Sequence, residues 1–212
     1  IATSVSKIEK IKIKKLYNKK TILYPNALTI NYKIKTKIPL NNYIIYSGSC
    51  LYKPNRVAVE YLNHKIMPNL LKNFPNLKLV LTGGGFNKKF PWLINKGIVK
   101  KKELYNLIFF SKFMCVPLKF GSGTRIKIIE ALSIGAIVLS TSKGIEGIEL
   151  NRKNPPFIFN NSKKLLKLIT YVLKNNKKIK KMAIKNRSFY MKKYSMESNT
   201  EEFLKKNSKI FF

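Results

Sequence analysis

Short apolar runs alternate with longer stretches in which apolar residues recur every three or four positions along most of this chain. A short run fits a buried strand, whereas the three-to-four spacing fits one face of a helix. The runs predict strands at 44–46, 77–81, 97–99, 113–116, 137–140 and 157–159. The longer stretches predict helices at 54–71, 102–112, 162–174 and 177–194, and one more that follows residue 124. Strands that alternate with helices through short connections form a parallel sheet with right-handed crossovers, so the sequence predicts a doubly wound α/β domain.

The first 26 residues precede this region and have a pattern of their own. Residues 4–20 have helical character with lysines at most exposed positions, and residues 21–24 predict a short strand that ends at Pro25. Ser6 and Glu9 have the Ser-x-x-Glu spacing of a capping box, which indicates where the helix begins. A basic amphipathic helix on a membrane surface has similar chemistry, so that alternative stays open.

The carboxyl ends of the predicted strands indicate where a ligand would bind. In doubly wound sheets, ligands bind where these ends meet a reversal of strand order. This rule selects the loops at 47–53 and 118–124, which we expect to face each other across one crevice. A third loop, at 83–85, consists of three glycines but lacks the full dinucleotide-binding pattern, so a close approach of backbone segments is favoured there.

Residues 120–135, FGSGTRIKIIEALSIG, predict a glycine-containing turn followed by a helix. Gly121 and Gly123 free the backbone, Thr124 is placed to cap the helix, and apolar residues recur at 126, 129 and 132. Such a turn directs unpaired N–H groups and the positive end of a helix at one point. This arrangement suits a phosphate or a diphosphate.

Charged side chains on the same segment extend this prediction to a nucleotide. Arg125 and Lys127 add positive charge at the turn, and Glu130, about two turns into the helix, is placed to accept hydrogen bonds from sugar hydroxyls. The residues also have an ordinary structural interpretation. Glycine turns before helices are common, and Lys127 with Glu130 is a normal i, i+3 surface pair.

The composition is extremely basic. The 212 residues carry a formal net charge of +34, which comes mainly from lysine, since there are only four arginines. Such a surface attracts anionic membranes and nucleic acids. Nucleic-acid-binding proteins usually concentrate arginine and aromatic residues at their contacts, whereas these lysines are scattered along every segment. We therefore expect no dedicated nucleic-acid-binding face.

The sequence has features of a cytoplasmic protein. No apolar run approaches the roughly 18 residues that a membrane-spanning helix needs, and the start is too polar for a secretory signal. Cys50 and Cys115 fall in or beside predicted buried strands, which favours reduced thiols over a disulfide framework. Because the sequence opens with Ile1, we expect it to be part of a longer chain whose N-terminal portion is missing.

Residues 120–135, with 136–141 and the Gly-Ile-Glu-Gly turn at 144–147, resemble the donor-site segment of retaining glycosyltransferases with two Rossmann-like domains, the GT-B fold. The resemblance implies that Arg125 and Lys127 are catalytic, because they would stabilise the departing nucleoside diphosphate as its charge grows. It implies that Glu130 binds the nucleotide ribose. The other donor-binding positions that it implies are Gly48, Ser49, Gly84, Val99, Gly121, Ser122, Gly123 and Thr124.

Two departures from the family pattern affect how the donor would be held. The family has two glutamates seven residues apart, and Ser122 takes the place of the first, as it does in one large subgroup. The donor sugar is then left to Ser122 and the N–H groups of Gly123 and Thr124. Many relatives also carry an Arg and a Lys just after the first glycine turn, where this chain offers Lys53 or Arg56.

We expect neither a metal ion nor a cofactor. All nine acidic residues are glutamates, so the chain cannot supply the Asp-x-Asp motif of metal-dependent glycosyltransferases with a single Rossmann-like domain. With one histidine and no cysteine pair at ligand spacing, zinc is implausible. Lysine, arginine and helix N-termini must then meet the charge of the diphosphate, as they do in GT-B enzymes.

The resemblance also implies a domain organisation: the end of a truncated N-terminal domain, a linker, a Rossmann-like nucleotide-sugar-binding domain and a tail that crosses back, at 1–26, 27–42, 43–194 and 195–212. The implied reaction is metal-independent, retaining transfer of a sugar from a nucleotide diphosphate sugar to a glycan or lipid-linked acceptor, as in polysaccharide biosynthesis. Implied partners are the donor, the acceptor and the missing N-terminal domain, with an anionic membrane surface as a further candidate on the cytoplasmic face. We expect the fragment alone to bind nucleotide weakly and to catalyse little or nothing.

Three alternatives stay open. A sugar-nucleotide epimerase of the same fold would need acid–base residues that the sequence does not show. A basic nucleic-acid-binding protein would use the glycine turns only for structure, and its binding would depend steeply on salt. A membrane-surface scaffold would bind anionic lipid through its lysines without sugar chemistry.

Overall fold

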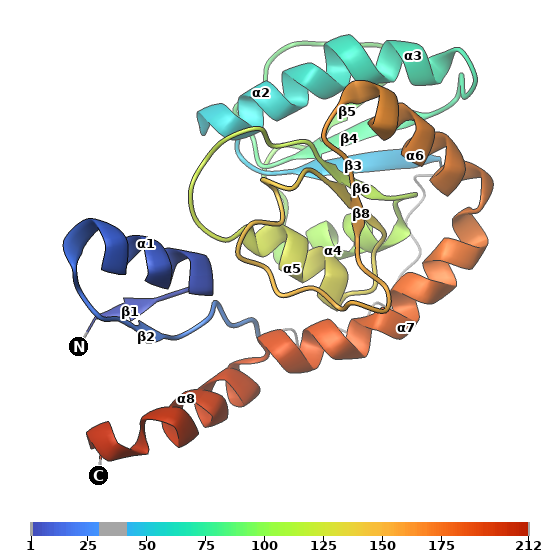
Figure 1. The fold of residues 1–212 in the computed structure, drawn as a ribbon. Coiled ribbons are helices and arrows are strands. Elements are labelled where there is room, and N and C mark those ends of the chain that lie inside the picture. Colours follow the sequence, from blue (N-terminus) through green and yellow to red (C-terminus); the bar gives the residue numbers. More distant parts are fainter. Residues whose placement is uncertain (1, 30–41, 212) are drawn as a thin grey trace.

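The computed structural model describes residues 2–29 and 42–211, and within them a six-stranded parallel sheet forms the centre of the molecule (Figure 1). Its strands are β3 (Tyr43–Ser47), β4 (Lys78–Thr82), β5 (Leu93–Asn95), β6 (Met114–Val116), β7 (Val138–Ser140) and β8 (Phe157–Ile158). Their order across the sheet is β5-β4-β3-β6-β7-β8, with every pair parallel. The predicted doubly wound, Rossmann-like α/β fold is confirmed.

Helices cover both faces of this sheet, which explains why its central strands are mainly apolar. They are α2 (Lys53–Tyr61), α3 (Met67–Leu71), α4 (Lys101–Phe110), α5 (Ile126–Ser133), α6 (Ser162–Lys174) and α7 (Asn176–Tyr194). One face carries α2, α3 and α6, and the other carries α4, α5 and α7 (Figure 1). All five residues of β3 are buried between the two layers.

The helix predicted at 54–71 is interrupted by a π-helical turn, η1 (Leu62–Ile66). The N–H of Met67 donates to the carbonyl of Leu62, five residues earlier, instead of to the residue four earlier. Pro68 follows directly, and its ring clashes with the carbonyl four residues before it in a regular helix. The wider turn accommodates that proline without ending the helical path.

The start of the chain forms a small unit beside the sheet domain. It consists of β1 (Thr3–Ser4), α1 (Lys7–Tyr17) and β2 (Ile22–Leu23), with β1 and β2 parallel. The sequence predicted α1 and β2 but missed β1, which has only two residues. Ser6 caps α1 by accepting a hydrogen bond from the N–H of Glu9, while the Glu9 carboxylate accepts from the N–H of Val5, one residue earlier than a regular capping box places it.

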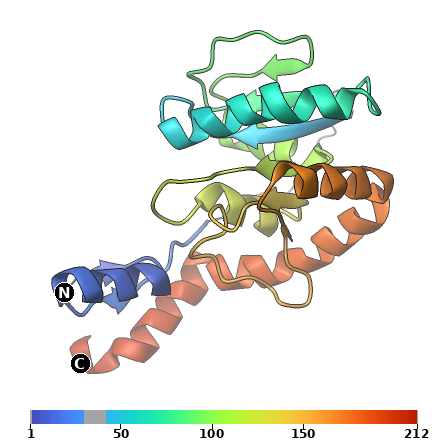
Figure 2. The same ribbon diagram turned by 45° about the horizontal axis from the view of Figure 1, so that its top comes forward.

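The last helix, α8 (Met196–Phe211), runs from the sheet domain toward this N-terminal unit. Figures 1 and 2 both show the two segments side by side, although they stand at opposite ends of the sequence. The rings of Tyr24 and Phe203 pack edge to face with centroids 5.0 Å apart, and the Tyr24 hydroxyl lies 3.3 Å from Thr200 Oγ1. The helix α8 therefore contacts the N-terminal unit, while the domain boundaries expected at 1–26, 27–42, 43–194 and 195–212 stay a prediction.

The structure differs from the sequence prediction at one strand, and one predicted segment lies largely outside the described residues. The strand predicted at 97–99 is wrong, because β5 ends at Asn95 and Gly97 has a φ of +59° that suits a turn. The linker expected at 27–42 lies largely outside the described residues, which omit 30–41. Cys50 and Cys115 are both buried and unpaired, as the apolar surroundings predicted.

Within the described ranges, no helix is long and apolar enough to cross a bilayer. The same residues contain no group of three or more His, Cys, Asp or Glu side chains arranged to hold a metal ion.

Candidate functional site

The strand order reverses between β3 and β6, so the loops that follow these two strands meet at the centre of the sheet edge. A Cβ added to Gly121 would lie 3.0 Å from Tyr52 Oη and 3.3 Å from Pro54 Cγ. The two loops are therefore in contact with each other, while the crevice expected between them stays a prediction.

A second close contact joins the turn at Gly48 to the glycine loop after β4. A Cβ on Gly83 would lie 2.5 Å from the carbonyl carbon of Gly48 and 2.7 Å from the nitrogen of Ser49. The N–H of Gly48 donates to the carbonyl of Thr82 at 2.9 Å. The three-glycine loop thus serves close backbone packing, as its incomplete motif indicated.

The remaining predicted positions near these loops lie at the same edge. Ser49 Oγ accepts a hydrogen bond from the N–H of Leu51 at 3.3 Å and so shapes its own turn. A Cβ on Gly84 would meet the side chain of Ile98 at 3.4 Å, and Ile98 is 88% exposed. Val99 follows it, half-buried against the core, directly before α4. Gly84 therefore lies beside Ile98, the exposed residue that precedes Val99.

Arg125 is buried beneath the glycine turn at 121–124. Its side chain donates from Nη1 to the carbonyls of both Ser122 and Gly123, whereas Nε and Nη2 have no hydrogen-bond partner among the described residues. Only 7% of the residue is exposed. The sequence expected this cation to point at a ligand, but the turn covers it, because its nearest acceptors are the carbonyls of the turn itself.

Because these two carbonyls point inward, they also fix the direction of the N–H group in the same peptide unit. In a planar trans peptide the C=O and the following N–H point in opposite directions. Since Arg125 holds the carbonyls of Ser122 and Gly123, the N–H groups of Gly123 and Thr124 point away from the guanidinium. Space is open beside Gly123, where an added Cβ would meet nothing within 4 Å.

The predicted cap of α5 is wrong. The helix begins after Arg125, which occupies the N-cap position and makes no side-chain capping bond. The Thr124 hydroxyl is buried without a hydrogen-bond partner among the described residues, and a Cβ on Gly147 would approach it to 3.3 Å. Packing against the 144–147 loop therefore decides its position. Ile126, expected on the buried face, is 44% exposed, whereas Ile129 and Leu132 are buried as predicted.

Lys127 reaches from α5 to the underside of the first glycine turn. Its ammonium donates to the carbonyl of Ser47 at 2.6 Å, to Asn55 Oδ1 at 2.9 Å and to the Tyr46 hydroxyl at 3.3 Å. A Cβ on Gly48, which has a φ of +143°, would lie 2.5 Å from Nζ, so a side chain there would be strained and would displace the ammonium. Burial, and then the nearby charge of Arg125, lower the pKa of Lys127 to about 7.

Asn55 holds the first glycine turn from the other side, and sequence reasoning missed it. Its Oδ1 accepts from the Tyr46 hydroxyl at 2.7 Å as well as from Lys127, and its Nδ2 donates to the carbonyl of Ser49 at 2.8 Å. An asparagine in the first turn of a helix is common and carries no signal of such a role, so only the fold identifies it.

Glu130 lies on the side of α5 that faces α4. Its carboxylate accepts a hydrogen bond from the Tyr105 hydroxyl at 2.9 Å and pairs with Lys101 at 3.5 Å. The side chain is 14% exposed. Glu130 therefore stands apart from the buried cations, next to the start of α4 that follows Val99.

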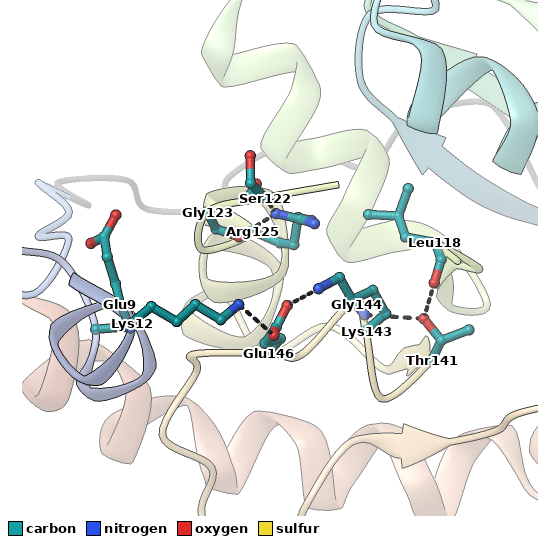
Figure 3. A network of polar contacts seen from close by, with 11 residues as sticks. Glu9, Lys12, Leu118, Ser122, Gly123, Arg125, Thr141, Lys143, Gly144 and Glu146 are labelled. Carbon is teal, nitrogen blue, oxygen red and sulfur yellow. Dashed lines mark hydrogen bonds and ion pairs between the residues drawn. The ribbon is translucent and has the colours of Figure 1, made fainter. Parts of the chain in front are cut away.

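A cavity of about 350 Å³ opens on the outer side of the 121–124 turn. Its walls are that turn, the 143–147 loop and the N-terminal unit at Ser6, Glu9 and Lys12. Figure 3 shows the Glu146 side chain between two ammonium groups, those of Lys12 and Lys143. The hydrogen bond and the charge of Lys143, and then the charge of Lys12, hold the pKa of Glu146 below its usual range. The sequence pointed to the turn that contains Glu146 but assigned this residue no role.

The structure thus brings the predicted residues to one edge of the sheet without gathering them in one cavity. Gly121, Ser122, Gly123 and Thr124 line the cavity, and Arg125 and Lys127 lie beneath the two turns. Glu130 contacts Tyr105 and Lys101 of α4. Such an edge presents outward N–H groups over buried positive charge at its centre. A carboxylate lies to one side. These groups suit an elongated anionic ligand that carries hydroxyls.

Comparisons with known proteins agree with this chemistry. A family model described as glycosyl transferases group 1 matches residues 41–175. An uncharacterized 44.6 kDa protein in the cps region of Klebsiella pneumoniae is 25% identical over 203 residues, covering 89% of this chain and 52% of that protein. The chain therefore spans about half the length of this curated relative.

Two solved structures share the fold at low sequence identity. HepE of Anabaena, in complex with UDP-glucose, is 12% identical with a TM-score of 0.73, and the match covers 98% of this chain and 63% of HepE. Sucrose-phosphate synthase from Thermosynechococcus elongatus is also 12% identical with a TM-score of 0.73, and the match covers 99% of this chain and 58% of the synthase.

The backbone contact between the glycine turns predicts that an alanine at Gly83 destabilises the chain more than an alanine at Gly123. Gly83→Ala should lower the free energy of unfolding by about 2 kcal/mol or more, because the methyl group meets backbone atoms at a φ of +110°. Gly123→Ala, at a φ of +77° with open space around it, should cost only the conformational strain, about 1 kcal/mol. Urea unfolding of both variants checks the difference, and equal losses would contradict the packing described here.

Proposed function

Because the chain belongs to the glycosyl transferases group 1 family, we propose that it holds the nucleotide diphosphate sugar in a metal-independent, retaining glycosyl transfer. Its parallel sheet with flanking helices is the Rossmann-like arrangement of GT-B glycosyltransferases. HepE and sucrose-phosphate synthase share this fold with the chain. Since the chain spans about half of its curated relative, the reaction of the whole protein is part of the proposal. The cps region that this relative is named for supports polysaccharide biosynthesis, with a glycan or lipid-linked acceptor.

The proposal rests on the orientation of the 121–124 turn, whose carbonyls point inward to Arg125. The guanidinium draws two carbonyls inward, which turns the N–H groups of Gly123 and Thr124 outward at the positive start of α5. These donors are fixed before any ligand arrives. When the bond between the sugar and the diphosphate breaks, negative charge grows on the diphosphate. Preorganised N–H groups and a buried cation behind them stabilise that charge without reorganising.

The two ends of the donor are assigned to the two sides of this turn. On one side, Glu130 accepts hydroxyl hydrogen bonds from the ribose, and the loop at Gly84 and Val99 holds the base. On the other side, the cavity lined by Ser122 and the 143–147 loop takes the donor sugar. UDP-glucose is the first donor to test, because HepE was solved with it.

The proposal of metal independence rests on which charged residues the chain has. The chain has no aspartate and therefore no Asp-x-Asp motif, while Arg125 and Lys127 place two cations under the proposed diphosphate position. Buried cations experience a lower dielectric than solvent, so their attraction for a diphosphate is stronger there than at the surface. They take the role that a divalent cation has in metal-dependent enzymes.

Calorimetric titration of the chain with UDP-glucose tests the proposal. We expect saturable binding that Arg125→Gln weakens by about tenfold or more, because the turn loses both its anchor and its charge. Arg187→Gln, on α7, is the matched control and should bind like the unaltered chain. Salt-sensitive binding of duplex DNA without any saturable nucleotide binding would favour the nucleic-acid alternative instead.

The lowered pKa of Lys127 predicts a pH dependence for this binding. An anionic ligand favours the protonated ammonium, so affinity for UDP-glucose should be constant below about pH 7 and fall by up to about tenfold per pH unit above it. Lys127→Met should bind more weakly and show no such slope between about pH 7 and about pH 8.5. Titrations across this range decide the matter, and identical slopes for both proteins would show that Lys127 is not coupled to the ligand.

The ribose assignment predicts a loss at one carboxylate. Glu130→Ala should weaken binding of UDP by about tenfold or more while leaving the melting temperature close to that of the unaltered chain. Tyr105→Phe removes the hydrogen bond to Glu130 but keeps the carboxylate, so it should retain binding. Fluorescence or calorimetric titration with UDP distinguishes the two, and unchanged affinity in Glu130→Ala would contradict the assignment.

A further inference from the structure

A second cavity, of about 430 Å³, lies at the opposite edge of the sheet from the candidate site. It opens at the amino ends of β7 and β8, where Val138 and Phe157 begin their strands, and α6 and α7 form its walls. Figure 1 shows these two helices as an orange arc around one end of the sheet. The cavity is mainly apolar, and its lining includes Leu132, Ala136, Leu168, Tyr171, Ile179 and Met182.

The mouth of this cavity is apolar as well. Tyr171 on α6 is 51% exposed and Met182 on α7 is 43% exposed, and both line the cavity. Large apolar side chains that gather at the entrance of an apolar cavity mark a surface that another apolar group covers.

The segment that contains α6 and α7, the walls of the cavity, carries charge of one sign. Between Glu149 and Glu197 the sequence carries twelve lysines and two arginines but no acidic residue. Exposed lysines flank the lining residues of both helices at helical spacing: Lys164, Lys167 and Lys174 on α6, and Lys178, Lys181 and Lys185 on α7. No carboxylate side chain of this segment offsets these cations.

We propose that this cavity binds an anionic phospholipid of a bilayer, with an acyl chain among the apolar lining residues and headgroup phosphates on the surrounding lysines. The apolar lining and the surrounding lysines together favour this ligand. A nucleic acid would use the lysines but has nothing to place in an apolar cavity, and a small apolar molecule would use the cavity but not the lysines. An anionic lipid is complementary to both.

The position of the cavity makes the proposal independent of sugar transfer. The candidate site is built from loops at the carboxyl ends of the strands, whereas this cavity is built at their amino ends. A lipid bound here would leave the donor loops uncovered. Loss of nucleotide binding would therefore not affect lipid binding, and failure of one proposal is distinguishable from failure of the other.

Insertion of an acyl chain can be separated from simple electrostatic adsorption by a fluorescent reporter. Met182→Trp in a Trp92→Phe background places the single tryptophan at the cavity mouth. Mixed with vesicles of phosphatidylglycerol and phosphatidylcholine, its emission should shift to the blue, and lipids brominated on their acyl chains should quench it by about half or more. Vesicles of phosphatidylcholine alone should cause neither change. The same reporter at Leu16→Trp, on the basic helix α1, should be quenched much less.

A matched pair of charge variants tests the lysines. Replacing Lys178, Lys181 and Lys185 with glutamine should weaken vesicle binding by about tenfold or more in flotation assays, since each cation near an anionic surface contributes substantially. Replacing Lys10, Lys14 and Lys15 on α1 removes the same charge from a different helix and should have a much smaller effect. Equal losses in the two triple variants would overturn the proposal in favour of non-specific attraction. The same conclusion would follow if the tryptophan of Met182→Trp stayed unquenched on vesicle-bound protein.

Discussion

A buried ammonium group holds the centre of this molecule's functional edge together. Lys127 extends from α5, which follows β6, to the underside of the turn that follows β3, and it donates to three oxygens there. These are the two strands between which the strand order reverses. A buried charge without such acceptors would be costly, so the turn, Asn55 and the absence of a side chain at Gly48 are all constrained by this one contact.

The chain carries a very large excess of positive charge, and the structure separates it into two populations. Most lysines are exposed and screened by solvent and salt, so each contributes little alone. Arg125 and Lys127 are enclosed by backbone, where their charge acts over a low dielectric. Arg125 has a further effect that an exposed cation could not have, because it determines which edge of the 121–124 turn faces outward.

The two edges of the parallel sheet have different chemistry, which follows from how the fold is wound. Loops at the carboxyl ends carry the glycines, which permit close backbone contacts and outward N–H groups. At the amino ends, α6 and α7 bring apolar residues and lysines together around a cavity. One sheet therefore presents a polar edge to the proposed donor and an apolar, lysine-rich edge to the proposed lipid.

The sequence by itself determined the elements and their order. The apolar runs of β3, β4 and β6 and the helical spacing of α6 and α7 are local patterns, and parallel winding follows from their alternation. It also selected the two loops that meet at the strand-order reversal, because the rule that selects them depends only on topology. The missed β1 and the misplaced β5 have two and three residues, too few for a periodic signal.

Only the tertiary structure decided where the polar side chains of these loops point. The sequence assigned Arg125, Lys127 and Glu130 to one ligand but could not give their contacts: Arg125 lies under its own loop, Lys127 reaches the turn after β3, and Glu130 pairs with Tyr105. The Thr124 cap failed and Asn55 went unnoticed for the same reason. The direction of a side chain on a loop depends on which acceptors from distant parts of the chain come within about 3 Å of it, and no local pattern in the sequence encodes that distance.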